Sequence, residues 1–353
     1  MNDIADTQSP VTVRLASPID RARWNGYVDR EPSASIYHRY EWGEIFDAVY
    51  GKPFIPLIAE QAGRVVGVLP IVSLHRGPRP AEWVSLPYFG HAGAVAESET
   101  AWHALINHAA ALGRERGVRH VELRHGHPIP ANTLPSRDDK VLMHLALPSD
   151  IEELNKSVGS KLRNDIKKPQ REGMTAEIGG AELLSEFHGA YASVMRDLGS
   201  PCHSRALFAE TMARFPDRTF IVRVVYEGRT AGAAFLIGQG DVLEVPCAGT
   251  LHSLNKLRPN MLLYWSVFRA AIERGYKTFS FGRSTIDAGT YNFKKQWGSV
   301  PVALPYTYLL REGEAAPGSL GASTRLQQVS DLWTKLPLPL ANFLGPQLVR
   351  HLP

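Results

Sequence analysis

The stretch FIPLIAEQAGRVVGVLPIV at residues 54–72 has a counterpart, FIVRVVYEGRTAGAAFLI, at residues 220–237. In both stretches, branched and aromatic residues fill two arms, and a glycine, Gly63 or Gly228, stands where the chain must reverse. Arms of this composition around a glycine are typical of a β-hairpin. The sequence therefore predicts a strand pair in each half of the chain.

The match between the halves continues after the hairpins. An apolar stripe at helical spacing follows each hairpin, over residues 102–112 in the first half and 261–272 in the second. Each predicted helix ends in Glu-Arg-Gly, where Gly117 or Gly275 can take the left-handed conformation, and a short apolar strand comes next. We interpret this agreement as a duplication. It predicts an α/β fold of two tandem domains, each with a mixed sheet and crossover helices.

The domain boundary is expected between the two copies. A length of 353 residues suits about two domains. A strand predicted over residues 141–147 closes the first half, so we expect domains at 1–148 and 149–311 and a linker with a Pro/Leu-rich tail at 312–353. The last strand of one half could complete the sheet of the other.

The composition limits the class of protein. With 44% hydrophobic and 21% charged residues, the chain is neither disordered nor a fibrous rod. The net charge of +4 is a slight excess, compatible with an anionic small molecule or a nucleic acid. Cys202 and Cys247, the only cysteines, cannot form a disulfide framework. Because the sequence shows no leader pattern and no apolar run of about 18 residues, we expect a cytoplasmic protein.

Two duplicated αβ units suggest the acetyltransferase superfamily, whose donor loop has a Gln/Arg-x-x-Gly-x-Gly/Ala motif. Residues 229–234, RTAGAA, match that motif. A phosphate-binding loop must open a helix, whereas this segment begins a predicted strand, so we do not assign it to coenzyme A. The sequence contains no other glycine-rich phosphate loop, and neither HExxH nor GxSxG occurs, so no metal site or serine nucleophile is predicted.

The segments FSFGRS at 279–284 and GTYNFKKQWG at 289–298 carry a more specific signal. With them, the chain resembles the Fem-type transferases, which are acetyltransferase (GNAT) relatives that include peptidoglycan-bridge aminoacyltransferases. The resemblance is closest to the subgroup associated with exosortase and exopolysaccharide loci. It also takes in SIYHRYEW at 35–42, PYFG at 87–90, SKLRN at 160–164, RDLGSP at 196–201 and LPLP at 336–339.

Lys294 is the main candidate for catalysis. Acyl transfer passes through an oxyanion, which a fixed cation can stabilise. In an extended segment Lys294 and Lys295 would point to opposite faces, so only one of them need enter a site. The resemblance implies that the lysine after phenylalanine, here Lys294, acts at the acyl carbonyl. The alternative is a pair of solvated lysines on an edge strand.

Arg283 and Ser284 end a predicted crossover strand, where open αβ sheets collect ligands. Arg283 could bind a phosphate or carboxylate, or form a structural ion pair. Tyr291 could relay a proton, although an aromatic side chain so close to Phe293 is more often part of the packing.

Several further residues are candidates for substrate binding. Lys161 and Arg163 belong to a basic segment whose apolar residues recur at helical spacing over 151–166; its cations form either a solvated face or a landing site for phosphates. Tyr88 and Gly90 lie in the first-half loop equivalent to residues 252–260. The remaining candidates are His38, before a helical run, Ser284, and Trp297 in the FKKQWG segment.

These features lead to one main hypothesis and one alternative. The resemblance implies an acyl- or aminoacyltransferase of cell-envelope or exopolysaccharide assembly, without a tightly bound cofactor, that uses an acyl thioester or aminoacyl-tRNA as co-substrate. Its acceptor would be a phosphorylated or lipid-linked envelope precursor. The tail either packs on the body or touches the inner membrane. The alternative is a catalytically inert docking module that binds an anionic polymer or a membrane surface through the basic segment.

Overall fold

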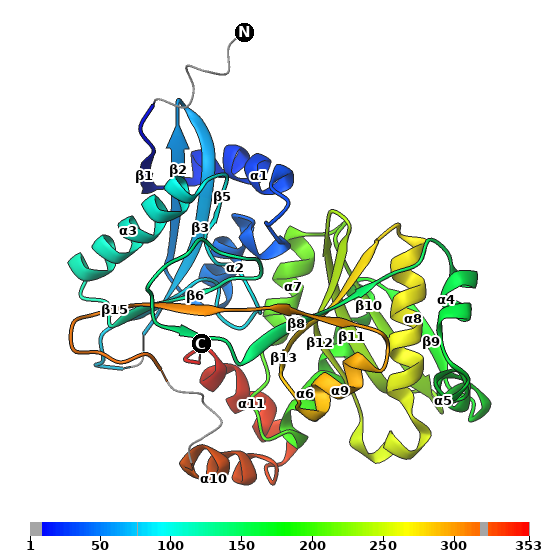
Figure 1. Ribbon diagram of the computed structural model, residues 1–353. Helices are drawn as coiled ribbons and strands as arrows, with labels where there is room; N and C mark the ends of the chain where they lie inside the picture. The colour runs from blue at the N-terminus through cyan, green and yellow to red at the C-terminus, as the bar shows by residue number, and fades with distance from the viewer. Residues whose placement is uncertain (1–8, 76, 318–323, 353) are drawn as a thin grey trace.

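The protein contains two mixed β-sheets flanked by helices (Figure 1). The computed structural model describes residues 9–75, 77–317 and 324–352. The start of the N-terminal segment, residues 1–8, and residues 318–323 of the predicted linker lie outside the described residues. The predicted α/β class with two tandem mixed sheets is confirmed.

The first sheet has the strand order β1-β2-β3-β4-β6-β15-β7, with β5 paired to β3. Its strands are β1 (Thr12–Leu15), β2 (Phe54–Gln61), β3 (Arg64–Leu74), β4 (Glu82–Val84), β5 (Val95–Ala96), β6 (His120–Arg124), β7 (Ser136–Arg137) and β15 (Tyr306–Leu310). The accompanying helices are α1 (Arg21–Arg30), the short η3 (Ile36–His38), α2 (Glu41–Tyr50) and α3 (Glu99–Glu115).

The second sheet has the order β14-β8-β13-β12-β11-β10-β9. Its strands are β8 (Lys140–Ala146), β9 (Thr175–Gly179), β10 (Thr219–Tyr226), β11 (Arg229–Gln239), β12 (Val242–Thr250), β13 (Thr278–Thr285) and β14 (Val300–Ala303). Its helices are α4 (Ile151–Ser157), α5 (Ser160–Arg171), α6 (Leu184–Asp197), α7 (Arg205–Arg214), α8 (Pro259–Glu273) and α9 (Gly289–Lys295). The tail forms α10 (Thr324–Trp333) and α11 (Leu338–Val349).

Both halves follow the duplicated plan. The hairpins β2–β3 and β10–β11 are antiparallel, and their turns contain Gly63 and Gly228 at positive φ. Each half then has one parallel pair, β4 with β6 and β12 with β13. The β12–β13 register ends where Glu244 faces Ser280, although both strands run on beyond it. The strands therefore separate at their carboxyl ends, which is where a ligand can enter an open αβ sheet.

Each sheet is completed by a strand from the other half. β8, which precedes residue 148, lies between β13 and β14, and β15 pairs with β6 in the first sheet. Because of this exchange, a single boundary residue does not separate the strands of the two sheets. The predicted residue ranges of the domains stay a prediction.

A shared apolar cluster also joins the halves. Tyr37, Trp42 and Phe89 of the first half pack together with Leu207 and Phe215 of the second. The rings of Tyr37 and Phe89 stack with centroids 4.9 Å apart, and Trp42 lies 5.6 Å from Phe215. Aromatic pairs of this kind stabilise a contact by about 0.5–1.5 kcal/mol beyond their burial.

Two stretches differ from their predicted form. The helical spacing over 151–166 predicted one segment, but the chain forms α4 and α5 with a break at Val158 and Gly159. Pro169, predicted as an interruption, lies inside α5. In the tail, Pro337 is the N-cap of α11 and Pro346 lies within it, so these prolines do not prevent a helix here.

The tail packs on the body through one face of α11 and contacts both halves. A Cβ placed on Gly345 would lie 3.0 Å from the backbone nitrogen of Cys202, so only glycine allows this close approach. Arg350 donates to the carbonyl of Tyr50 at 2.8 Å. Within the part of the chain that the structure describes, no helix has the length and apolar character required to cross a bilayer.

Candidate functional site

Glu244 lies at the point where β12 and β13 separate. Its carboxylate is buried and accepts hydrogen bonds from the Tyr37 hydroxyl at 2.6 Å and the Ser280 hydroxyl at 2.9 Å. Burial raises the pKa of Glu244, and the two hydrogen bonds oppose this rise. Because Tyr37 comes from η3, the carboxyl group links the first half to the second.

Lys294 lies beside the same opening. Only 8% of its surface is exposed, and its Nζ donates to the carbonyl oxygens of Arg283 at 2.9 Å and Gly282 at 3.3 Å. Burial is the main cause that lowers the pKa of Lys294 from 10.5 to about 8; the charge of Glu244 opposes this change, and the charge of Arg283 adds to it. An ammonium group has three N–H donors, and the described residues accept only two of them. One of its N–H donors therefore has no acceptor among the described residues.

The segment that carries Lys294 is a helix, which corrects the prediction of an extended strand. The amide of Asn292 bonds to Ala288 at 3.1 Å, and these turns build α9. Neighbouring residues on a helix point about 100° apart, so Lys294 is buried whereas Lys295 is exposed. Lys295 lies over the ring of Tyr291, with its Nζ 5.8 Å from the centroid. Of these two lysines, Lys294 is the buried one, and its role in the site stays a prediction.

Tyr291 and Ser284 are both buried. Tyr291 belongs to the hydrophobic core around α8, which is the packing role weighed against a proton relay. Ser284 is the last but one residue of β13, and its hydroxyl has no partner among the described residues. Neither side chain forms a hydrogen bond with Lys294, so both stay predictions as site residues.

Arg283 is exposed at the same end of β13. Its Nη1 donates to the hydroxyl of Tyr306 at 3.5 Å, and no carboxylate of the described residues pairs with it. Its charge lowers the pKa of Lys294 and of His203. Arg283 therefore places an unneutralised guanidinium near both groups, which suits an anionic ligand.

Tyr88 and His203 form a contact between the halves. Their ring centroids are 4.7 Å apart, and His203 Nδ1 is 3.0 Å from the hydroxyl of Tyr50. Burial lowers the pKa of His203 to about 3, so the ring is neutral near pH 7. The Tyr88 hydroxyl has no partner among the described residues, and Tyr88 has a φ of 74°. Such a backbone is strained for a non-glycine residue.

His38 and Gly90 are buried in the first half, where they contribute hydrogen bonds and close packing. His38 accepts from the Ser35 amide at 3.0 Å, and its other nitrogen lies 3.0 Å from the Gly93 carbonyl. Burial lowers the pKa of His38 to about 3. Gly90 is buried, and a Cβ there would meet Leu142 of β8 at 3.5 Å. The structure gives both residues a packing role, and their part in binding stays a prediction.

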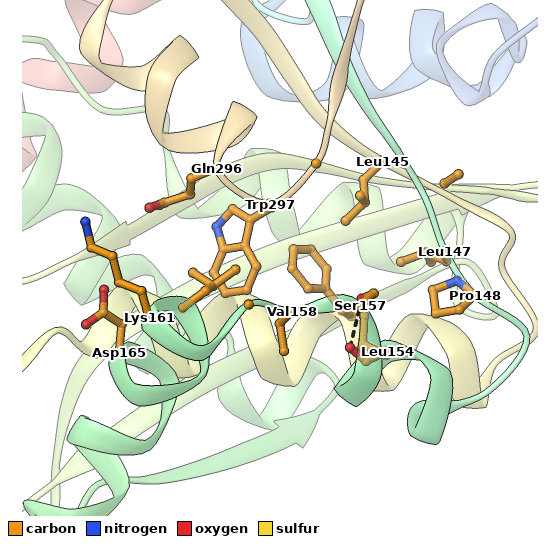
Figure 2. A pocket seen from close by; sticks show the side chains of 15 residues that line it. Leu145, Leu147, Pro148, Leu154, Ser157, Val158, Lys161, Asp165, Gln296 and Trp297 are labelled. Atoms are coloured by element: carbon orange, nitrogen blue, oxygen red, sulfur yellow. Dashed lines mark hydrogen bonds between the residues drawn. The ribbon is translucent and has the colours of Figure 1, made fainter.

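Lys161 and Trp297 line a different place, a cavity of 740 Å³ between α4, α5 and α8 (Figure 2). Arg163 does not line this cavity. It donates to the carbonyls of Asn155 at 3.1 Å and Val158 at 3.0 Å, and so caps the end of α4. The predicted residues thus fall into two groups, one around Lys294 and one around Lys161.

Sequence reasoning missed Glu244. It predicted His38 as a site residue, whereas its neighbour Tyr37 forms the hydrogen bond to Glu244. A signal for Glu244 exists, because it is the one charged residue in the apolar stretch VLEVP at 242–246. A charge at such a position is expected to have a buried partner. Among the described residues, no group of three or more His, Cys, Asp or Glu side chains could hold a metal ion.

Comparison with known proteins matches part of this chain to one family. Residues 160–295 match the acetyltransferase (GNAT) domain family, and this match supports an acyltransferase. The segment at 229–234 lies inside β11, as predicted, and so does not open a helix. A comparison with curated protein sequences gives no significant match.

Several solved structures are similar in fold to most of this chain. FemX aligns with a TM-score of 0.65 and 12% identity over 85% of this chain and 97% of its own. L-PGS from Bacillus licheniformis aligns at 0.56 and 11%, over 92% and 99%. A tandem GNAT protein from the clavulanic acid biosynthesis pathway aligns at 0.52 and 12%, over 88% and 100%. The chain therefore shares the overall fold of these proteins, and this agrees with the tandem GNAT-like domains predicted from its sequence.

Proposed function

We propose that this protein transfers an activated acyl or aminoacyl group to an amine or hydroxyl of a cell-envelope or exopolysaccharide precursor. The observation that carries the proposal is the buried ammonium of Lys294, with one free donor at the opening between β12 and β13. A donor fixed in a site of low dielectric stabilises developing negative charge more strongly than water does.

The reaction would proceed by direct attack. The acceptor's nitrogen or oxygen forms a bond to the acyl carbonyl carbon, and the carbonyl oxygen becomes an oxyanion that accepts a hydrogen bond from Lys294. The bond to the thiol or ribose oxygen of the donor then breaks, and the leaving group takes up a proton. The acceptor's proton passes to a base, for which we propose the buried Glu244 carboxyl group, whose charge acts on Lys294.

Arg283 would bind the phosphate of the donor or of the acceptor. It is exposed, unpaired by carboxylates of the described residues, and close enough to Lys294 for its charge to be felt there. The GNAT match favours an acyl thioester as donor, and aminoacyl-tRNA is the second option. Membership of the exosortase-associated subgroup and a cytoplasmic location remain part of this proposal.

The tail would hold the enzyme at the inner membrane. α11 contains no charged residue. One face, including Gly345, is buried on the body, whereas Phe343 is 71% exposed and Leu340 and Leu348 are exposed beside it. Exposed apolar side chains that lie close together mark a surface for contact with a partner or a membrane. Lys335, exposed and without a carboxylate partner among the described residues, suits anionic headgroups.

Vesicle sedimentation tests this contact. We expect binding to phosphatidylglycerol vesicles, weaker binding to phosphatidylcholine, and at least about tenfold weaker partitioning of F343E. I19E is the matched control, because Ile19 is 88% exposed but lies outside the tail. Equal partitioning of F343E and the unmodified protein would contradict membrane contact through α11.

The test of transfer uses neighbouring lysines. The protein is incubated with a panel of acyl thioesters and aminoacyl-tRNAs, and acceptor masses are recorded. We expect K294M to lose transfer and K295M, at the exposed neighbour, to keep it. The docking-module alternative expects no transfer at all, together with loss of binding when Lys161, Arg163 and Lys167 are neutralised.

A further inference from the structure

The 740 Å³ cavity beside α5 is a second ligand site candidate (Figure 2). Its walls come from the end of β8, from α4, α5 and α8, and from the residues that follow Lys294. Its volume lies within the range of about 300–1,000 Å³ that is common for small-molecule sites. Neither Lys294 nor Arg283 lines it, so it is separate from the proposed acyl-transfer site.

Most of the cavity wall is apolar. Leu147 and Pro148 lie at one end, Leu154 and Val158 run along one side, and Phe268 contributes an aromatic surface. Water in such a space finds few hydrogen-bond partners on the walls, so an apolar group that replaces it gains free energy. The wall chemistry therefore favours a hydrocarbon over a polar ligand.

The opposite end of the cavity is positive. Lys161 and Asp165 lie there (Figure 2), but the Asp165 carboxylate is paired with Arg258, whereas the Lys161 ammonium has no ion-pair partner among the described residues. Gly159 also lines the cavity and is the N-cap of α5, where no side chain caps the first amides of the helix. A free cation and an uncapped helix start both favour an anion.

Trp297 supplies an independent indication of a ligand at this end. Its side chain is more than nine-tenths buried, and its indole N–H has no acceptor among the described residues. In Figure 2 the indole nitrogen faces the end of the cavity where Gln296 and Lys161 lie. A buried donor without a partner is costly, and an oxygen atom of a ligand in the cavity would satisfy it.

We propose that this cavity binds a single-chain amphiphile, with its alkyl chain along the apolar walls and its anionic group at Lys161. The order of the lining, cation at one end and Leu147 and Pro148 at the other, matches the order of groups in such a molecule. Fatty acids, fatty-acyl thioesters and lysophospholipids share this chemistry. The inference goes beyond the proposed transfer and does not depend on it.

Calorimetric titration of the full chain tests the proposal. The probes are octanoate, decanoate and dodecanoate below their micelle-forming concentrations, followed by dodecanol, a dodecanoyl thioester and lysophosphatidylglycerol. We expect the dissociation constant to fall about fourfold for each added methylene. The last two probes identify the natural source of the chain. Dissociation constants that do not change with chain length would overturn the proposal.

Variants locate the bound chain. Ser157 is exposed and lines the cavity, so S157W blocks it without disturbing the core, and L162W fills it from α5. We expect both to abolish dodecanoate binding. K161Q is expected to weaken dodecanoate about tenfold but not dodecanol, whereas K167Q, on the same helix but outside this cavity, leaves both unchanged. Unaltered dodecanoate binding by folded S157W and L162W would refute the assignment.

The two proposals can fail separately. K294M is expected to bind dodecanoate like the unmodified protein, because Lys294 does not line the cavity. Loss of transfer in K294M with no chain binding in the unmodified protein would reject only the amphiphile site. Chain binding with intact transfer in K294M would reject only the role of Lys294.

Discussion

The pKa of Lys294 makes a prediction that needs no substrate. Burial lowers that pKa from 10.5 to about 8, so the folded protein releases this proton at a lower pH than the unfolded chain. Between these values the unfolded state binds more protons, and stability therefore rises with pH. Below pH 8 both states are protonated, and the folded state carries the full cost of a buried ammonium.

The perturbation is K294M, which keeps an unbranched side chain of similar length but removes the titrating group. At about 1.36 kcal/mol per pKa unit, the stability of the unmodified protein relative to K294M should rise by about 2.5 kcal/mol between pH 7 and pH 10. Contributions that do not depend on pH, such as the hydrogen bonds lost to Gly282 and Arg283, cancel in this difference.

Urea unfolding at pH 7, 8, 9 and 10 measures the effect, with K295M as the control. Lys295 is exposed on the same helix, so its replacement should give a difference that stays flat over the same range. A rise below about 1 kcal/mol for K294M would mean that the ammonium is solvated. In that case Lys294 could not stabilise an oxyanion in the way proposed.

Three further predictions concern other parts of the site and the core. Y37F removes the 2.6 Å hydrogen bond to Glu244, so the buried carboxyl group loses a donor. Urea titration should show a free energy of unfolding that is lower by about 1–3 kcal/mol, and a change below about 0.5 kcal/mol would contradict this contact. R283Q should raise the KM for a phosphorylated co-substrate at least about tenfold while the melting temperature stays unchanged, because Arg283 pairs with no carboxylate of the described residues; an unaltered KM speaks against phosphate binding there. Burial lowers the pKa of His38, and of the buried His125 that follows β6, to about 3, whereas the value in the unfolded chain is 6.5. The stability that depends on these neutral rings is therefore present above pH 6.5 and is lost as the pH falls, by about 2 kcal/mol for each ring between pH 7.5 and pH 5. Urea unfolding measures this loss, with the exposed-site variant H252N as control, and a flat profile would exclude their burial.

The sequence predicted those parts of the fold that depend on local pattern. The hairpins at 54–72 and 220–237 and the helices that follow them lie where periodicity and glycine placement put them. α9 was predicted as extended because its seven residues contain too few apolar positions to reveal a helical period. Its backbone is instead fixed by tertiary packing of Tyr291 in the core around α8.

The candidate site was only partly predictable for a related reason. A residue such as Lys294 can be singled out by its motif, but its partners are set by which strands become neighbours. Glu244 and Tyr37 are separated by 207 positions in the chain and meet because η3 packs against the opening between β12 and β13. No spacing rule relates two residues that far apart. The pairing appears only once the topology is known.

The exchange of strands explains how two halves can hold one site. β8 of the first half lies beside β13, which carries Arg283, and β15 of the second half places Tyr306 within 3.5 Å of the same guanidinium. β13 is therefore paired with a strand from the first half and contacted by a residue of the first sheet. The two sequence halves cannot separate completely without breaking the β-sheet hydrogen bonds of β8 with β13 and of β15 with β6. Lys294 is tied to β13 by its hydrogen bonds to the carbonyls of Gly282 and Arg283, and such fixed placement of a donor is the preorganisation that oxyanion stabilisation requires.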